Sequence, residues 1–276
     1  MADTYLSDLF AAYDTFIIGS SGVLTSPDGA FYPGAEDALA GLAEQGKQVI
    51  IYDNSSLLPA AHFVNPHWRK WADKGFRFYT SFGLCMAHVQ QQGYFSYFLF
   101  GSRPLPGLIF MPEMTMAEFI YLDIPGLPLA YLRPENLINV PGLSNLGFAV
   151  SLEPFADFLH QAREQEKVIY SGNPSFADKM LINNHEVLSN RSILAYYRSL
   201  GGQVMEFGKP HIASYRQILQ QLPAPGKILC IGNSLEPDGQ GVVHLRQAGY
   251  KAASLLIGAE NNSEADYSAP AFSLTD

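Results

Sequence analysis

The chain has 276 residues, of which 47% are hydrophobic and 16% are charged, as is typical of a compact globular protein and not of a disordered one. This length leaves room for one large domain or two modest ones. The formal net charge of −9 opposes broad contact with nucleic acid or an anionic membrane, so we expect neither as a partner.

The first ninety residues alternate strand and helix signals. A short apolar run at 16–18 predicts a buried strand, and the helical spacing of the apolar residues in 38–43 predicts a helix that ends at Gly46. Residues 49–52 predict the next strand, and residues 76–81 a third. A strand–helix–strand unit of this kind gives parallel strands joined by a right-handed crossover.

The middle and the last third of the chain differ in composition. Residues 94–148 are crowded with aromatic residues and prolines, which indicates an inserted second domain whose apolar surface fits either a core or a homodimer contact. The last third alternates again, with a strand at 227–231, a helix through 242–245 and a final strand at 252–257. We therefore predict an α/β protein with a doubly wound parallel sheet.

Polar loops follow three of the predicted strands. They are Gly19-Ser20-Ser21-Gly22, Asp53-Asn54-Ser55-Ser56, and Gly232-Asn233 with Asp238 a few residues later. In a parallel sheet, these strand ends meet at one edge. Lys209 precedes a predicted helix, where a cation opposes the helix dipole unless its ammonium reaches an anion or a carboxylate. We expect it to pair with Asp53.

The order of these motifs resembles the haloacid dehalogenase (HAD) superfamily, and more closely its capped p-nitrophenylphosphatase-type members. The pieces that carry the resemblance are "YPGAEDALAGLAEQGKQVIIYDNSS", "FGKPHIASYRQIL" and "SGNPSFAD". The resemblance implies a HAD-like (Rossmannoid) core formed by residues 1–92 and 183–276. It also implies a smaller α/β cap domain inserted at 93–182.

The family's chemistry implies an aspartate nucleophile after the first strand and a Mg²⁺ ion held by neighbouring acids. Here the nucleophile position falls on Gly19, and the general acid/base position two residues later falls on Ser21. The second-motif hydroxyl position falls on Asp53, and the first acid of the fourth motif falls on Asn233. Lys209 and Asp238 match the family pattern.

Two functional hypotheses remain open at this stage. The first is a degenerate HAD-like pseudoenzyme that binds a small phosphorylated ligand or a protein, with no cofactor or a weakly bound Mg²⁺ at Asp238. Its expected ligand-binding residues are Ser20, Ser21, Gly22, Asn54, Ser55, Lys209 and Asn173. The second is an active hydrolase or transferase with altered chemistry centred on Asp53, as base or nucleophile, together with Lys209. Separately, Ser20 or Ser21 could be a substitute nucleophile only if a base lay beside it.

Cysteine usage and the start of the chain bear on the compartment. Cys85 and Cys230 lie far apart and match no metal or redox spacing. The acidic opening "MADTYLSDLF" lacks the basic region of a secretory signal. We therefore expect a cytoplasmic protein.

Overall fold

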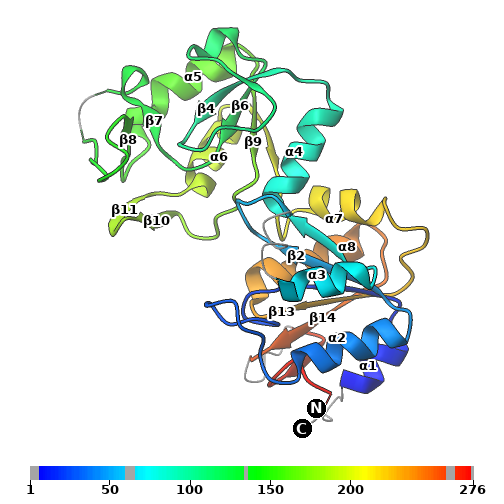
Figure 1. Cartoon of the computed structure of the whole chain (residues 1–276). Coiled ribbons are helices and arrows are strands. Elements are labelled where there is room, and N and C mark those ends of the chain that lie inside the picture. The colour runs from blue at the N-terminus through cyan, green and yellow to red at the C-terminus, as the bar shows by residue number, and fades with distance from the viewer. Residues whose placement is uncertain (1–5, 60–65, 134–135, 259–264, 275–276) are drawn as a thin grey trace. The chain divides into compact units, whose positions relative to one another are not determined.

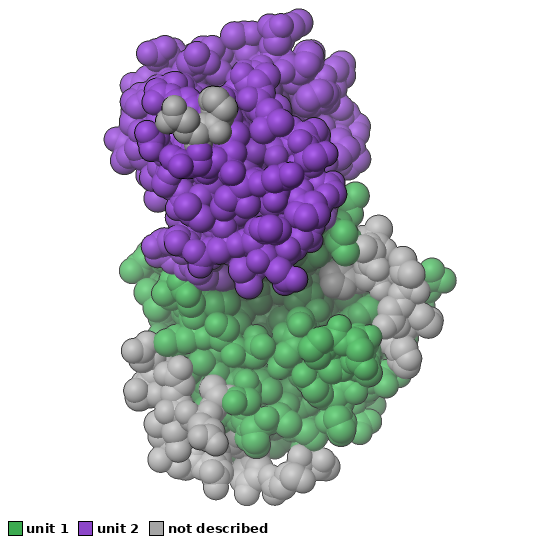
Figure 2. Space-filling view, turned by 90° about the vertical axis from the view of Figure 1, so that its left-hand side faces the viewer, with its two compact units in different colours: residues 1–81, 208–276 green, residues 82–207 purple. Residues whose placement is uncertain are grey.

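The computed structural model describes residues 6–59, 66–133, 136–258 and 265–274. The chain forms two compact units, one made of residues 1–81 and 208–276 and the other of residues 82–207 (Figures 1 and 2). No helix among the described residues is long and apolar enough to cross a membrane.

The first unit is a six-stranded parallel sheet in the order β15-β14-β13-β1-β2-β3. Its strands are β1 (Thr15–Ile18), β2 (Gln48–Asp53), β3 (Arg77–Thr80), β13 (Ile228–Gly232), β14 (Ala252–Ile257) and β15 (Tyr267–Ala269). Its helices are α1 (Leu6–Ala12), α2 (Ala35–Glu44), α3 (Pro66–Asp73), α7 (Ile212–Leu219) and α8 (Gln240–Gln247), with a π-helical turn, η5, at Leu235–Gly239.

Helices cover both faces of this sheet, which makes it doubly wound as predicted (Figure 1). Alternate strand residues such as Phe16, Ile18 and Ile51 share one core with the apolar sides of α1, α2 and α3. On the other face, α8 packs on β14 and α7, and Tyr52 of β2 meets Tyr215 of α7 edge-on at 5.8 Å. Burial on both faces explains why the central strands are continuous apolar runs.

The second unit is a five-stranded parallel sheet in the order β12-β9-β6-β4-β5. Its strands are β4 (Ser96–Phe100), β5 (Ile109–Phe110), β6 (Phe119–Leu122), β9 (Val168–Ser171) and β12 (Gln203–Glu206), and its helices are α4 (Ser81–Gln91), α5 (Ala156–Glu164) and α6 (Asn190–Ser199). Two small antiparallel pairs join β7 (Leu127–Pro128) to β8 (Leu146–Gly147) and β10 (Lys179–Ile182) to β11 (His185–Leu188). Short 3₁₀ turns lie at η2 (Met114–Met116), η3 (Leu129–Tyr131) and η4 (Glu153–Phe155).

The second unit is longer at both ends than the expected insert, 93–182. At its start, His88 of α4 packs against Tyr170 of β9, with ring centroids 5.7 Å apart. At its end, α6 buries Ile193, Leu194 and Tyr197 in the same core as α5 and β6. Packing therefore groups both helices with the second unit, whereas the bounds implied by the resemblance lie at 93 and 182.

Strand β15 corrects the expectation that 252–257 is the final strand. It pairs in parallel with β14 through Leu255↔Tyr267. Asp266, just before β15, accepts hydrogen bonds from the Ser254 N–H at 2.8 Å and the Ser254 hydroxyl at 2.9 Å, and it pairs with Arg246 at 2.6 Å. Side-chain bonds at one residue thus fix a strand too short to give a sequence pattern.

We predict that Asp266→Ala lowers the free energy of unfolding by about 1–3 kcal/mol, because it removes hydrogen bonds to a charged acceptor. Partial burial opposes the anion, but Arg246 and Ser254 outweigh it and lower the pKa of Asp266. The stabilisation is therefore present above about pH 4 and lost as the pH falls below that value. Urea unfolding at pH 7 and pH 3 measures both effects.

The matched control is Asp157→Ala, which breaks the exposed ion pair with Arg133. We expect that variant to lose less than about 1 kcal/mol, as is usual for surface pairs. Equal losses in the two variants, or a loss at Asp266 that does not depend on pH, would contradict the role assigned to Asp266.

Candidate functional site

The carboxyl ends of β1, β2 and β13 lie together at one edge of the first sheet. Ile18 stands beside Ile51 on one side and Ile231 on the other, so the loops that follow begin at the same level. The Gly19 N–H donates to the Ile231 carbonyl at 2.9 Å, which ties the first loop to β13. The fold thus brings the three polar loops to a common edge, as predicted.

Asp53 interacts with the loop after β1 through both of its carboxylate oxygens. Oδ1 accepts the backbone N–H of Ser20 at 2.7 Å, and Oδ2 accepts the Ser20 hydroxyl at 2.5 Å. Ser20 is only 8% exposed. A backbone amide and a hydroxyl that could hold an external anion therefore already hold a carboxylate of the protein.

Lys209 forms its ion pair with Asp238, which corrects the expected pairing with Asp53. The distance from Nζ to Oδ1 is 2.6 Å, and the side chains are only 10% and 6% exposed. Burial disfavours the ammonium, but the charge of Asp238, followed by that of Asp53, outweighs burial and raises the pKa of Lys209. Lys209 therefore stays charged, with Asp53 as a second and weaker electrostatic partner.

The turn after β13 explains why Asp238 is the partner. A Cβ atom on Gly232 would lie 1.9 Å from Cγ of Asp238, so only glycine lets the acid fold back against the strand end. The Ser234 N–H donates to the other oxygen, Oδ2, at 3.2 Å. The π-helical turn that carries Asp238 thus aims the acid at the edge of the sheet.

Asn54 holds the backbone of Lys209. Its Nδ2 donates to the Lys209 carbonyl at 2.8 Å, and its Oδ1 accepts the Lys209 N–H at 2.6 Å. Both ends of the amide are used, so Asn54, expected as a ligand-binding residue, positions the lysine. This reciprocal clamp was not visible in the sequence, because 155 residues separate the two partners.

Internal side chains fill the space around the glycine loop. A Cβ atom on Gly19 would lie 3.3 Å from Nζ of Lys209, so the ammonium occupies the region into which a residue-19 side chain would extend. The Asn233 amide lies over Gly22, where a Cβ atom would come within 2.0 Å of Nδ2.

Ser21 is exposed, and the Ser55 hydroxyl accepts the Leu57 N–H at 3.2 Å.

The donor set at this edge does not fit a divalent cation. Mg²⁺ requires anionic oxygens, yet residue 19 has no side chain, residue 233 is a neutral amide, and Asp238 is paired with an ammonium. Within the described ranges, no group of three or more His, Cys, Asp or Glu side chains could hold a metal ion. No chemical step at this edge is therefore assigned to a metal.

Asn173, the remaining expected ligand residue, lies in the second unit, where it follows β9. Its Nδ2 donates to the Asp123 carbonyl at 2.9 Å. The fully buried Asn190 donates to the same carbonyl at 2.9 Å and to the Asn173 carbonyl at 3.0 Å. These amides join the carboxyl ends of β6 and β9 to the start of α6.

Asp123 is an acid that the sequence reasoning missed. It is 2% exposed and accepts the Arg103 N–H at 3.1 Å and the Ser102 hydroxyl at 3.5 Å. Burial raises the pKa of its carboxyl, and the nearby charge of Arg103 opposes the rise. Its position directly after the apolar run 119–122 was the available signal, because acids at strand ends mark the edge where α/β proteins bind ligands.

The fold is that of the haloacid dehalogenase-like hydrolases, in the form of the p-nitrophenylphosphatases that carry an inserted α/β domain. Among solved structures, a haloacid dehalogenase-like hydrolase from Brucella suis 1330 aligns over 98% of this chain and 99% of its own, with 18% identity and a TM-score of 0.62. The 4-nitrophenylphosphatase from Thermotoga maritima aligns over 96% of both chains, with 18% identity and a TM-score of 0.61. NagD from E. coli K-12 covers 96% of this chain and 98% of its own, with 16% identity and a TM-score of 0.60.

No family model matches the sequence, and no curated protein matches it. At such low identity, the likeness to solved structures establishes the fold alone. The side chains at the strand ends, and not the fold, decide the activity.

We predict that Lys209→Met and Asp238→Asn each lower the free energy of unfolding by about 3–5 kcal/mol, because each single change leaves a buried group without its partner. Each single variant buries one charge without its partner, whereas the double variant buries neither charge. The double variant should therefore lose less free energy of unfolding than the sum of the two single losses. Denaturant unfolding of all four proteins gives the coupling energy.

The exposed pair Lys179–Glu186, with a comparable separation of 2.7 Å, provides the matched control. Lys179→Met should change the free energy of unfolding by less than about 1 kcal/mol. Purely additive losses at Lys209 and Asp238 would show that the two side chains do not depend on each other.

Proposed function

We propose that this protein is a catalytically degenerate HAD-fold phosphatase relative that acts as a ligand-binding or protein-interaction module. One observation carries the proposal: the charged side chains at the carboxyl edge are already bonded to other residues of the chain. Asp53 is held by the N–H and hydroxyl of Ser20, and Lys209 is held by Asp238 at 2.6 Å. Gly19 supplies no nucleophile, so a phosphoryl group would meet neither an attacking carboxylate nor an uncommitted cation.

A small phosphorylated molecule is the proposed ligand, because the solved structures with this fold include a 4-nitrophenylphosphatase. Ser21 and Asn233 are both exposed at this edge and are the side chains proposed to contact it. We propose binding without turnover through side chains that remain accessible, because the N–H groups of Gly19, Ser20 and Gly22 already donate to acceptors within the chain.

An active hydrolase is the second candidate, and the contact between Ser20 and Asp53 supports it. The hydroxyl lies 2.5 Å from Oδ2, as in a nucleophile beside its base. In this mechanism the Ser20 oxygen forms a bond to phosphorus while the bond from phosphorus to the leaving oxygen breaks. Asp53 accepts the hydroxyl proton and returns it to the leaving oxygen, and Lys209 offsets the developing negative charge. Against it stands the burial of Ser20, which is 8% exposed.

A second copy of this chain is the proposed protein partner, bound through the second unit. β5 forms the edge of its sheet, and the side chains of Ile109 and Phe110 are 60% and 48% exposed. Phe95 and Met116 add further exposed apolar area, at 72% and 61%. Apolar side chains on an edge strand favour self-association, because the free strand edge can pair as well.

A cytoplasmic location completes the proposal. Cys85 and Cys230 are both buried and free of any disulfide, which suits a reducing compartment.

We predict no release of phosphate above a buffer blank from p-nitrophenyl phosphate or from a panel of phosphorylated metabolites, with or without Mg²⁺. A thermal-shift titration with the same metabolites tests for binding without turnover. Mg²⁺-dependent turnover that disappears in Asp53→Asn would contradict the degenerate site. Metal-independent turnover that is lost in both Ser20→Ala and Asp53→Asn would establish the second candidate.

We also predict a concentration-dependent homodimer that Phe110→Asp converts to monomer, because a charge on the edge strand opposes pairing with a second copy. Sedimentation velocity over a dilution series measures this equilibrium. Leu181→Asp, at the 70%-exposed Leu181 on β10, is the control and should leave the dimer intact. A wild-type protein that is monomeric at all concentrations would exclude this surface as a dimer contact.

A further inference from the structure

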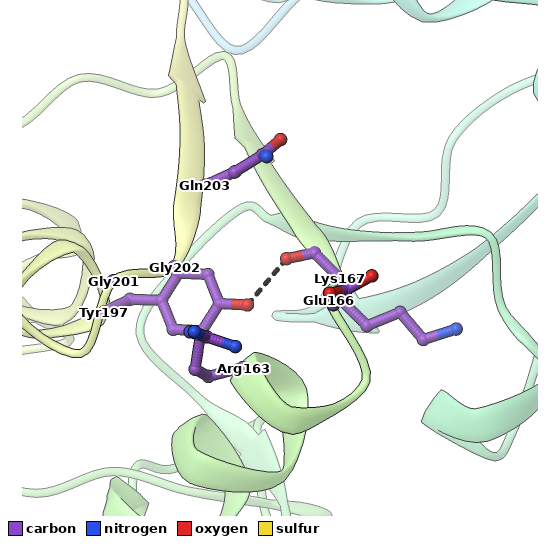
Figure 3. A pocket seen from close by; sticks show the side chains of 7 residues that line it. All are labelled: Arg163, Glu166, Lys167, Tyr197, Gly201, Gly202 and Gln203. Carbon is purple, nitrogen blue, oxygen red and sulfur yellow. Dashed lines mark hydrogen bonds between the residues drawn. The ribbon is translucent and has the colours of Figure 1, made fainter.

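A cavity of about 300 Å³ lies in the second unit, between the ends of α5 and α6 and the starts of β9 and β12 (Figure 3). Its lining residues are Arg163, Glu166, Lys167, Tyr197, Gly201, Gly202 and Gln203. The cavity is at the amino ends of these parallel strands, since Gln203 and Val168 pair in the first rung. It is therefore distinct from the carboxyl-end loops described above.

The lining of this cavity is unusual for a small-molecule site. Most ligand pockets are largely apolar with a few polar groups, but here every side chain is charged or polar and the other two residues are glycines. A cavity of this size and lining suits a small molecule that is itself charged.

Several contacts hold the walls in place. The Tyr197 hydroxyl donates to the Lys167 carbonyl at 2.6 Å, and Figure 3 shows the Lys167 amine extending away from that ring. The amine instead donates to the Ala117 carbonyl. A Cβ atom on Gly202 would lie 2.3 Å from the Tyr197 ring, so glycine is required beside it. Buried Tyr197 thus forms a fixed wall of the cavity, while Arg163, Glu166 and Gln203 line its solvent-exposed side.

Arg163 presents an oriented cation to the cavity. Its Nε donates to the Leu200 carbonyl at 3.2 Å, which fixes the plane of the guanidinium. In the part of the chain that the structure describes, no acceptor bonds to its terminal Nη atoms. Terminal Nη atoms without an acceptor can donate two parallel N–H bonds to a carboxylate.

Glu166 presents an anion to the same cavity, at a backbone position where glycine is usual. It has φ of 52°, in the left-handed region that costs a side chain conformational energy. After α2, α3, α4, α6 and α8, the corresponding left-handed residue is a glycine: Gly46, Gly75, Gly93, Gly201 and Gly249. Of the six helix ends compared, only the end of α5 has a carboxylate side chain at the left-handed position.

The two opposite charges do not neutralise each other. Residues three apart on a helix surface commonly pair, but Glu166 has left the helix in the left-handed conformation. Among the described residues, neither the Glu166 carboxylate nor the Arg163 Nη atoms have a partner. The carbonyl ends of α5 and α6 add negative potential that favours a cation.

We propose that this cavity binds a small zwitterion of the α-amino-acid type. Arg163 receives the carboxylate and Glu166 receives the ammonium, with Gln203 at the rim. The site is separate from the proposed function of the first unit and does not depend on it.

The test is a ¹H–¹⁵N NMR titration of the full chain with L-alanine, followed at the amides of Gly201 and Gly202. Propionate and ethylammonium are the matched half-probes, since each keeps one charge of the zwitterion. We expect saturable binding of L-alanine. Each half-probe should bind at least about tenfold more weakly, because it lacks one hydrogen bond to a charged group of the protein. Propionate that binds as tightly as L-alanine would overturn the role of Glu166.

Arg163→Gln and Glu166→Gln should each weaken L-alanine binding at least about tenfold for the same reason. Glu164→Gln, which removes an exposed acid of α5 outside the cavity lining, should leave binding unchanged. Wild-type protein that gives no saturable shift, or binding that survives both cavity variants, would overturn the proposal.

Glu166→Gly separates binding from folding. Glycine relieves the left-handed backbone, so we expect the thermal midpoint to rise while L-alanine binding is lost. A midpoint that falls would show that Glu166 is retained for stability and would overturn its assignment as a ligand-binding residue.

Discussion

The buried ion pair between Lys209 and Asp238 is the constraint on which the rest of the first unit's carboxyl edge depends. An ammonium that is 10% exposed is stable only beside a carboxylate, because water no longer solvates it. Three neighbouring residues accommodate this ion pair. Gly232 makes room for the acid, Asn54 clamps the lysine backbone, and Gly19 leaves open the space into which the ammonium projects.

The same pairing has consequences for chemistry. Lys209 is paired with Asp238, and Asp53 is hydrogen-bonded to the neutral Ser20, so none of these three side chains offers an unpaired cation to a phosphoryl group. The fold is that of the haloacid dehalogenase-like hydrolases, yet the fold positions only the strand ends, and the side chains there decide the reaction. The second unit shows the contrasting case, because Arg163 and Glu166 line one cavity without neutralising each other.

Local signals in the sequence located most of the first unit. The apolar runs at 16–18, 49–52 and 252–257 fall within β1, β2 and β14, because strands buried on both faces need continuous apolar residues. The short β15 was missed, since three half-buried residues held by Asp266 carry no periodicity. The limits of the inserted unit also differ from those expected. The apolar spacing of a helix such as α4 or α6 predicts the helix, but it does not predict which of the two cores the helix packs against.

The sequence by itself determined the fold class and the departures from the phosphatase motifs, since both depend on which residue stands after which strand. It also identified Asp53, Lys209 and Asp238 as the charges of the carboxyl edge. Only the tertiary structure decided how those charges pair. Lys209 lies 29 residues from Asp238 and 156 residues from Asp53 along the chain. Gly232 leaves room for Asp238 against the strand end, and this brings Asp238 within ion-pair distance of Lys209. The cavity in the second unit was likewise invisible, because its charges become neighbours only where two helices end side by side at the start of two paired strands.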